Sequence, residues 1–305
     1  MSDDALRHLL RKEQGWQILL PGVYLAYRGR VTNDQREMAA LLYAGPESVI
    51  TGQAALRRHG LACTDFDSID VLIPAGSQRK SVRFVHILRT TRMPEKYRTE
   101  KRIRFAYLPR AIGDATRKMQ DPRDVQALVS RAVQFGCAVT LLVEELNEGP
   151  VAGTRLFRAA VAEAAEGVRS SAEGDLKRLV DRSRIEKPLY NPELYLPDGT
   201  FLCSPDLWWE RYGVAGEVDS RAYHFTAKEH EDTTKRHNRI SRAGIHLLHW
   251  LPSIITREAD SVLNDIRTTL ASVAQATPPQ IITVPAGQSP PAGCRPPGPA
   301  HPGSL

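Results

Sequence analysis

Two short apolar strands separated by one long polar helix form the most constraining pattern in this 305-residue chain. The strands are expected over residues 214–219 and 245–250, and the helix over 226–243, where it begins with a capping box and ends before a glycine. Because side chains alternate along a strand, Glu217 and Asp219 share one face of the first strand. The sequence therefore predicts an α/β unit with acidic side chains on its sheet.

Two more carboxylates precede this pattern. A hairpin is expected from strands 194–196 and 201–203, joined by a Pro-Asp-Gly-Thr turn, and its second strand leads directly to Asp206. Upstream, a helix predicted to begin with Ser170 as its N-cap carries Glu173 in its first turn. Strands and helix would thus bring several carboxylates near one another.

Clustered carboxylates suit the hydrolysis of a phosphodiester. Attack by water is assisted by a hard divalent cation, which prefers oxygen ligands and neutralises the developing charge. Asp206 and Glu217, together with Asp219, are the predicted ligands of Mg²⁺ or Mn²⁺. Glu173 would orient the attacking water, and His224 would act as general base or as proton donor to the leaving oxygen.

The order of these residues resembles an uncharacterised domain family related to the very-short-patch-repair (Vsr) endonucleases, which have the PD-(D/E)xK fold. The matching positions are Glu173, Asp206, Glu217, Asp219, His224, Asp232, Arg236 or Arg239, and Gly244. The resemblance implies a DNA endonuclease with catalytic Glu173, Asp206, Glu217 and His224. Asp219 replaces the usual lysine and Ser220 the family's glycine, and no Vsr-type zinc site is apparent, so mismatch specificity is not implied.

The front of the chain is basic. Residues 1–110 contain 19 Lys and Arg against 11 Asp and Glu, a formal charge of +8, within a total of +6. A polyanionic partner such as DNA fits this charge, because neutralised phosphates release counterions. A strand pair turning at Pro21-Gly22, a helix over 33–44, and a second helix over 52–59 are also predicted in this half.

These features, with the segment 51–61, resemble the N-terminal region of AbiEi-family antitoxins, a winged helix-turn-helix followed by an α/β region. The resemblance implies DNA contacts by the helix before the wing and by the segment beyond the wing. The residues in those positions are Arg7, Arg11, Lys12, Arg28 and Arg30, to which Arg236 and Arg239 of the later helix are added. A single short helix precedes the wing, whereas the family usually has more.

The expected fold is thus an α+β winged helix-turn-helix with an α/β extension, followed by an α/β restriction-endonuclease-like domain with a mixed sheet. Its divisions are residues 1–75, the DNA-binding domain; 76–167, the α/β and helical middle region; 168–260, the endonuclease-fold domain; and 261–305, a helix with a disordered tail. Disorder is predicted because residues 277–305 contain nine of the 21 prolines.

Three functions are consistent with the sequence. The first is a Mg²⁺-dependent, DNA-directed endonuclease of defence or toxin–antitoxin type, in a cytoplasmic protein without a membrane association. The second is a non-catalytic regulator or antitoxin that binds DNA and neutralises a cognate toxin protein. The third is an interaction protein that uses Trp208, Trp209 and the polar helix to dock another protein.

Overall fold

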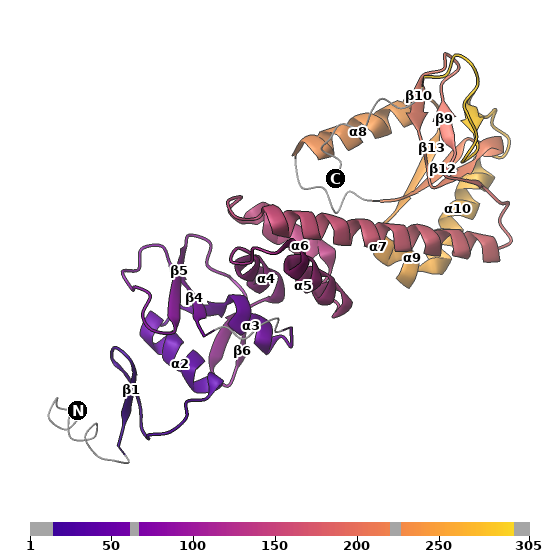
Figure 1. Cartoon of the computed structure of the whole chain (residues 1–305). Helices are drawn as coiled ribbons and strands as arrows, with labels where there is room; N and C mark the ends of the chain where they lie inside the picture. The colour runs from indigo at the N-terminus through magenta and orange to yellow at the C-terminus, as the bar shows by residue number, and fades with distance from the viewer. Residues whose placement is uncertain (1–14, 62–66, 220–226, 296–305) are drawn as a thin grey trace. The chain divides into compact units, whose positions relative to one another are not determined.

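The computed structural model of the chain describes residues 15–61, 67–219 and 227–295. Within those residues the protein is of mixed α/β type, with nine α-helices and four sheets (Figure 1). Contacts divide the chain into two compact units, unit 1 (Met1–Val161) and unit 2 (Ala162–Leu305). The division falls inside one continuous helix, α7 (Arg155–Arg182).

Unit 1 contains a β-hairpin, a five-stranded sheet and helices that pack on that sheet. The sheet has the order β5-β4-β3-β7-β6 and is mixed, with β4 parallel to β5 and β3 parallel to β7. The elements are β1 (Gln17–Leu20), β2 (Val23–Leu25), α2 (Asn33–Ala44), β3 (Val49–Thr51), α3 (Gly52–Arg58), β4 (Ile69–Pro74), β5 (Val85–Thr90), β6 (Tyr97–Glu100), β7 (Ile103–Ala106), α4 (Leu108–Thr116), α5 (Pro122–Gln134) and α6 (Val139–Glu148).

Local signals in this unit are confirmed. The hairpin β1–β2 turns at Gly22, whose φ of 76° favours glycine. Helix α2 begins with a capping box at Thr32 and ends at Gly45, which gives the predicted range 33–44. The second helix ends at Arg58, one residue before the expected boundary.

Gly52 at the start of α3 gives a testable stability effect. Its φ is +58°, and a Cβ added there would lie 2.7 Å from Oδ2 of Asp70. Asp70 cannot easily move, because His86 Nδ1 lies 2.9 Å from its Oδ1 and Lys118 also contacts it. We expect Gly52→Ala to lower the free energy of unfolding of unit 1 by about 2 kcal/mol. Urea denaturation should show no such loss for Gly76→Ala, where an added Cβ meets open space; equal losses would contradict this account.

Unit 2 has a four-stranded sheet, β13-β12-β11-β8, and a three-stranded sheet, β10-β9-β14. Strands β12 and β13 are parallel, and α8 is the crossover between them. Besides α7, the elements are β8 (Leu189–Tyr190), β9 (Glu193–Tyr195), β10 (Phe201–Cys203), β11 (Leu207–Trp209), the 3-10 helix η1 (Glu210–Tyr212), β12 (Val214–Val218), α8 (Ala227–Arg242), β13 (His246–Trp250), α9 (Pro252–Arg257), α10 (Ala259–Val273) and β14 (Ile282–Val284).

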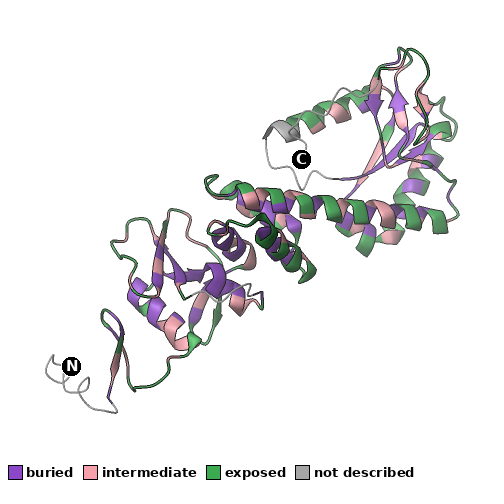
Figure 2. Ribbon diagram, in the orientation of Figure 1, coloured by how far each residue is buried: buried purple, intermediate pink, exposed green. Residues whose placement is uncertain are grey.

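The four-stranded sheet separates two hydrophobic cores. Trp209 belongs to the core that also contains residues of α7 and α10, whereas Trp208 belongs to the core that contains residues of α8, β9 and β10. Successive residues of β11 therefore face opposite sides of the sheet. Trp208 and Trp209 are 1% and 2% exposed, so the docking surface predicted from them is wrong. Figure 2 shows these buried strands beside the largely exposed α8.

Two expectations for unit 2 are corrected. Ser170 does not cap a helix, because it lies inside α7, one long helix that begins at Arg155. The tail 277–305 is not disordered throughout, since β14 pairs with the exposed edge of β9. Val284 is buried, and Thr283 Oγ1 accepts a hydrogen bond of 3.1 Å from Trp208 Nε1. A few well-placed apolar and polar contacts thus offset the ordering entropy that the proline content suggested.

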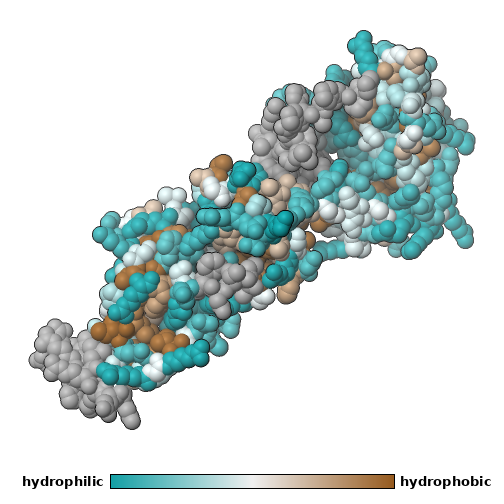
Figure 3. Space-filling model, in the orientation of Figure 1, coloured by the Kyte–Doolittle hydropathy of each residue, from teal (hydrophilic) through white to brown (hydrophobic). Residues whose placement is uncertain are grey.

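Hydrophilic side chains cover most of the face of unit 2 seen in Figure 3. Among the described residues, no helix combines the length and the apolar character that crossing a bilayer requires.

Candidate functional site

A small polar pocket in unit 2 gathers most of the acidic residues singled out from the sequence. It lies where β12 and β13 meet α8 and the segment before β11. Its lining residues are Arg169, Ser204, Asp206, Glu217, Val218, Asp219, Thr233, Arg236, His237 and His249. Three of the four predicted carboxylates, Asp206, Glu217 and Asp219, therefore reach one pocket, as the strand alternation implied.

Asp206 is held in place by the backbone of the neighbouring strand. Its Oδ2 accepts a hydrogen bond of 2.7 Å from the Val218 N–H. Antiparallel pairing of β11 with β12 sets this contact, because Leu207 lies opposite Gly216. The Asp206 side chain lines the pocket.

Glu217 and Asp219 are both buried, each being 7% exposed. Glu217 projects from β12 toward α8. There the two terminal guanidinium nitrogens of Arg236 donate to its carboxylate, Nη1 to Oε2 at 3.2 Å and Nη2 to Oε1. Arg236 lies against this carboxylate, and its predicted contact with DNA stays a prediction. A bidentate pair of this kind balances the buried charge of Glu217.

Burial is the main influence on the protonation of Glu217 and Asp206. Removal from water raises the pKa of Glu217, and the nearby Arg236 opposes that shift while Asp206 and Asp219 reinforce it. Burial likewise raises the pKa of Asp206, against the effects of the Val218 N–H and two arginines. Both carboxylates are thus held in an environment that favours proton or cation binding.

Glu173 lies beside the pocket rather than in its lining. It projects from α7 one turn after Arg169, whose Nε is 3.6 Å from Glu173 Oε1. Burial and the negative charge of Asp206 raise the pKa of Glu173. The negative charge of Asp206, in the segment before β11, therefore acts on the Glu173 carboxylate of α7.

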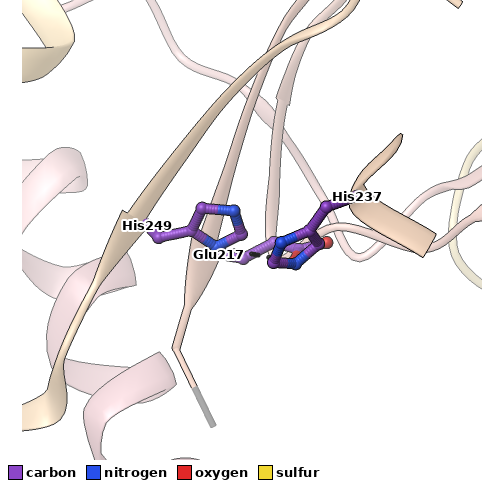
Figure 4. Close-up of side chains that lie close together, drawn as sticks. All are labelled: Glu217, His237 and His249. Atoms are coloured by element: carbon purple, nitrogen blue, oxygen red, sulfur yellow. Dashed lines mark ion pairs between the residues drawn. The ribbon is translucent and has the colours of Figure 1, made fainter. Parts of the chain in front are cut away.

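Two histidines complete the site and were not predicted from the sequence. His237 comes from α8 and His249 from β13, and their ring centroids are 4.4 Å apart (Figure 4). His249 Nδ1 lies 3.9 Å from Glu217 Oε2. Donor atoms of Glu217, His237 and His249 all fall within 4.8 Å of one another, a grouping able to hold a metal ion.

No protein-family model matches the chain, and no curated protein matches it either. The resemblances to Vsr-related and AbiEi-family proteins thus stay expectations, and the site must be interpreted from its own geometry.

The other predicted site residues are not part of this cluster. His224 and the basic residues Arg7, Arg11 and Lys12 lie outside the described residues. Arg28 and Arg30 are exposed beyond β2, and Arg239 is exposed on α8. Their predicted contacts with DNA stay predictions, as does the catalytic role of His224.

Proposed function

We propose that unit 2 is a metal-dependent DNA endonuclease domain and that the basic front of the chain brings it to DNA. The observation that carries this proposal is the convergence of Asp206, Glu217 and Asp219 in one polar pocket, with Glu173 beside it. Carboxylates crowded in a buried site raise one another's pKa and are unfavourable unless a cation balances them.

The donor set fits a divalent cation. Asp206 and Glu217 offer carboxylate oxygens, and burial raises the pKa of each despite the nearby arginines, so a divalent cation would stabilise their charged forms further. A bound cation would supply neutralisation of the charge that develops on the phosphate. Asp219, also in the lining, adds negative charge to the same position.

The chain's own residues have separate roles in this proposal. Glu173, with its raised pKa, would accept a proton from the attacking water and orient it. Arg169 lines the pocket, and its guanidinium would donate to a phosphate oxygen. His224 would donate the proton that the leaving oxygen needs.

A specific observation favours a second candidate, a non-catalytic regulator or antitoxin that binds DNA and a cognate toxin protein. Arg236 already satisfies Glu217 with two hydrogen bonds, so the pocket is stable without a cation. In that case unit 2 keeps its shape as a binding module. DNA would still bind, and its affinity would fall steeply with salt.

Cleavage of supercoiled plasmid by the purified full chain separates the two candidates. We expect nicking in Mg²⁺ or Mn²⁺, none in EDTA, and none for Asp206→Ala in any buffer. Duplex binding by the same Asp206→Ala protein should persist, since the basic residues are unchanged. Intact duplex binding without any metal-dependent nicking by the wild-type protein would reject the endonuclease and support the regulator.

A further inference from the structure

The two histidines of the pocket are the feature that the proposed function leaves unused. Glu217, His237 and His249 come from β12, α8 and β13, and they point toward a common centre (Figure 4). The parallel pairing of β12 and β13 places Glu217 directly opposite His249 in the sheet. The crossover helix α8 then covers that sheet face and delivers His237. Three separate elements thus supply one carboxylate and two imidazole nitrogens.

The donor chemistry of this group differs from that of a magnesium site. Mg²⁺ binds almost only oxygen and keeps several water ligands, whereas imidazole nitrogen suits Fe²⁺, Co²⁺, Ni²⁺ and Zn²⁺. A centre with two imidazoles and one carboxylate is therefore a transition-metal centre by its ligand types. Asp206 lies in the same pocket and offers a further oxygen.

The spacing of the donors is close to what one ion needs. Two ligand atoms that bind the same ion at about 2.1 Å cannot be more than about 4.2 Å apart. The donors here lie within 4.8 Å of one another. Side-chain rotations that move the donor atoms by less than about 1 Å would bring them within binding distance of one ion.

The Arg236 guanidinium competes with such an ion for the Glu217 carboxylate. Its guanidinium pairs with the Glu217 carboxylate, and only 9% of the Glu217 side chain is exposed. A cation bound to Glu217 must displace this pairing, since both positive groups compete for the same two oxygens. Arg236 thus stabilises the site without metal and weakens metal binding.

We propose that Glu217, His237 and His249 form a transition-metal site, selective for ions such as Co²⁺, Ni²⁺ or Zn²⁺ over Mg²⁺, in which Arg236 is the competitor for the carboxylate. The inference concerns the pocket of the proposed endonuclease and rests on that proposal only for the use of the ion. It would add two nitrogen ligands to the oxygen ligands expected from the sequence.

Titration of the full chain with CoCl₂ tests the site directly, because Co²⁺ bound by nitrogen and oxygen ligands acquires a visible absorption that aqueous Co²⁺ lacks at that intensity. We expect one Co²⁺ per chain, with Mg²⁺ about 100-fold weaker in competition. His237→Ala, His249→Ala and Glu217→Gln should each weaken Co²⁺ binding by about 100-fold or more. His246→Ala is the matched control, since His246 is exposed and lies three residues from His249 on the same strand.

Arg236→Gln provides a result that a failure to fold cannot imitate. Removing the competing charge should strengthen Co²⁺ binding by about tenfold, and circular dichroism should show that all variants retain the wild-type helix content. Equal Co²⁺ affinity in the His237→Ala, His249→Ala and wild-type proteins would overturn the inference, as would Mg²⁺ binding as tight as Co²⁺. A weaker rather than stronger Arg236→Gln site would contradict the role given to Arg236.

The activity assay keeps this inference separate from the proposed function. Tight Co²⁺ binding without plasmid nicking would retain the metal site and reject the endonuclease. Mg²⁺-dependent nicking that persists in His237→Ala and His249→Ala would retain the endonuclease and reject the transition-metal site.

Discussion

Plasmid nicking by Asp206→Asn is expected to fall by about 1,000-fold, while unit 2 of the same protein becomes more stable than in the wild type. Both effects come from one carboxylate. The loss of activity follows because asparagine lacks the charge that a cation site needs. The gain in stability follows because burial raises the pKa of Asp206, so its charge opposes folding. Asparagine keeps an Oδ1 that can accept the 2.7 Å hydrogen bond from the Val218 N–H.

The sign of the pH dependence is fixed by the direction of the pKa shifts. Burial raises the pKa of Glu173, Asp206 and Glu217. Above about pH 4 the unfolded chain loses these protons first, so the folded state holds more protons and its stability falls as pH rises. Asp206→Asn removes one of the three contributions. Its stabilising effect should therefore be absent near pH 3 and grow until the pH exceeds the folded pKa of Asp206.

Thermal unfolding in EDTA, followed by calorimetry between about pH 3 and pH 8, measures this difference without a bound ion. Glu210→Gln is the control, because it removes the same formal charge from an exposed position on η1. A lower melting temperature for Asp206→Asn than for wild type at pH 8 would show that the carboxylate stabilises the fold. Asp206 would then be a structural residue rather than part of a functional site.

Trp208→Ala is expected to lower the free energy of unfolding of unit 2 by about 3–5 kcal/mol, the usual cost of removing a large aromatic side chain from a core. The indole is 1% exposed and packs among Leu194, Leu202 and Ile240. The substitution also removes the donor to Thr283 Oγ1, which is 3.1 Å from Nε1. The tertiary contact that orders β14 would thus be lost with the core volume.

Hydrogen exchange and urea denaturation measure this effect on unit 2 separately from unit 1. Trp208→Phe is the companion variant, since it keeps most of the apolar volume but loses the hydrogen bond. We expect it to lower the free energy of unfolding by about 1–2 kcal/mol. Protection of the β14 amides should fall first in both variants. A loss below about 1 kcal/mol for Trp208→Ala would show that the core does not depend on this residue.

The carboxylates of the site could be predicted from the sequence because each belongs to a local pattern. Asp206 follows a hairpin strand, and Glu217 and Asp219 share a strand face through simple alternation. The same alternation gave β12 and β13 nearly to the residue. The helix carrying Glu173 was placed, but its start was wrong, because Ser170 suits an N-cap as well as the middle of a long polar helix.

The histidines could not be found in this way. His237 lies on a helix that is polar on most sides, and His249 is one of two histidines in a terminal strand, so neither departs from its local pattern. Their proximity depends on the parallel pairing of β12 with β13 and on the packing of α8, both of which are tertiary. The order of β14 was missed for a similar reason, because its stability comes from the β9 edge rather than from its own composition.

The parallel register of β12 and β13 has a consequence for how this pocket can change during divergence. Glu217 is opposite His249, and Val218 is opposite Trp250. One residue inserted into β13 before Leu248 would move Leu248 into the position opposite Glu217 and turn the imidazole of His249 to the other face of the sheet. Hydrocarbon would then replace nitrogen in the pocket although no ligand had been mutated. The ligand set is therefore encoded in the parity of strand positions as much as in the identity of the residues.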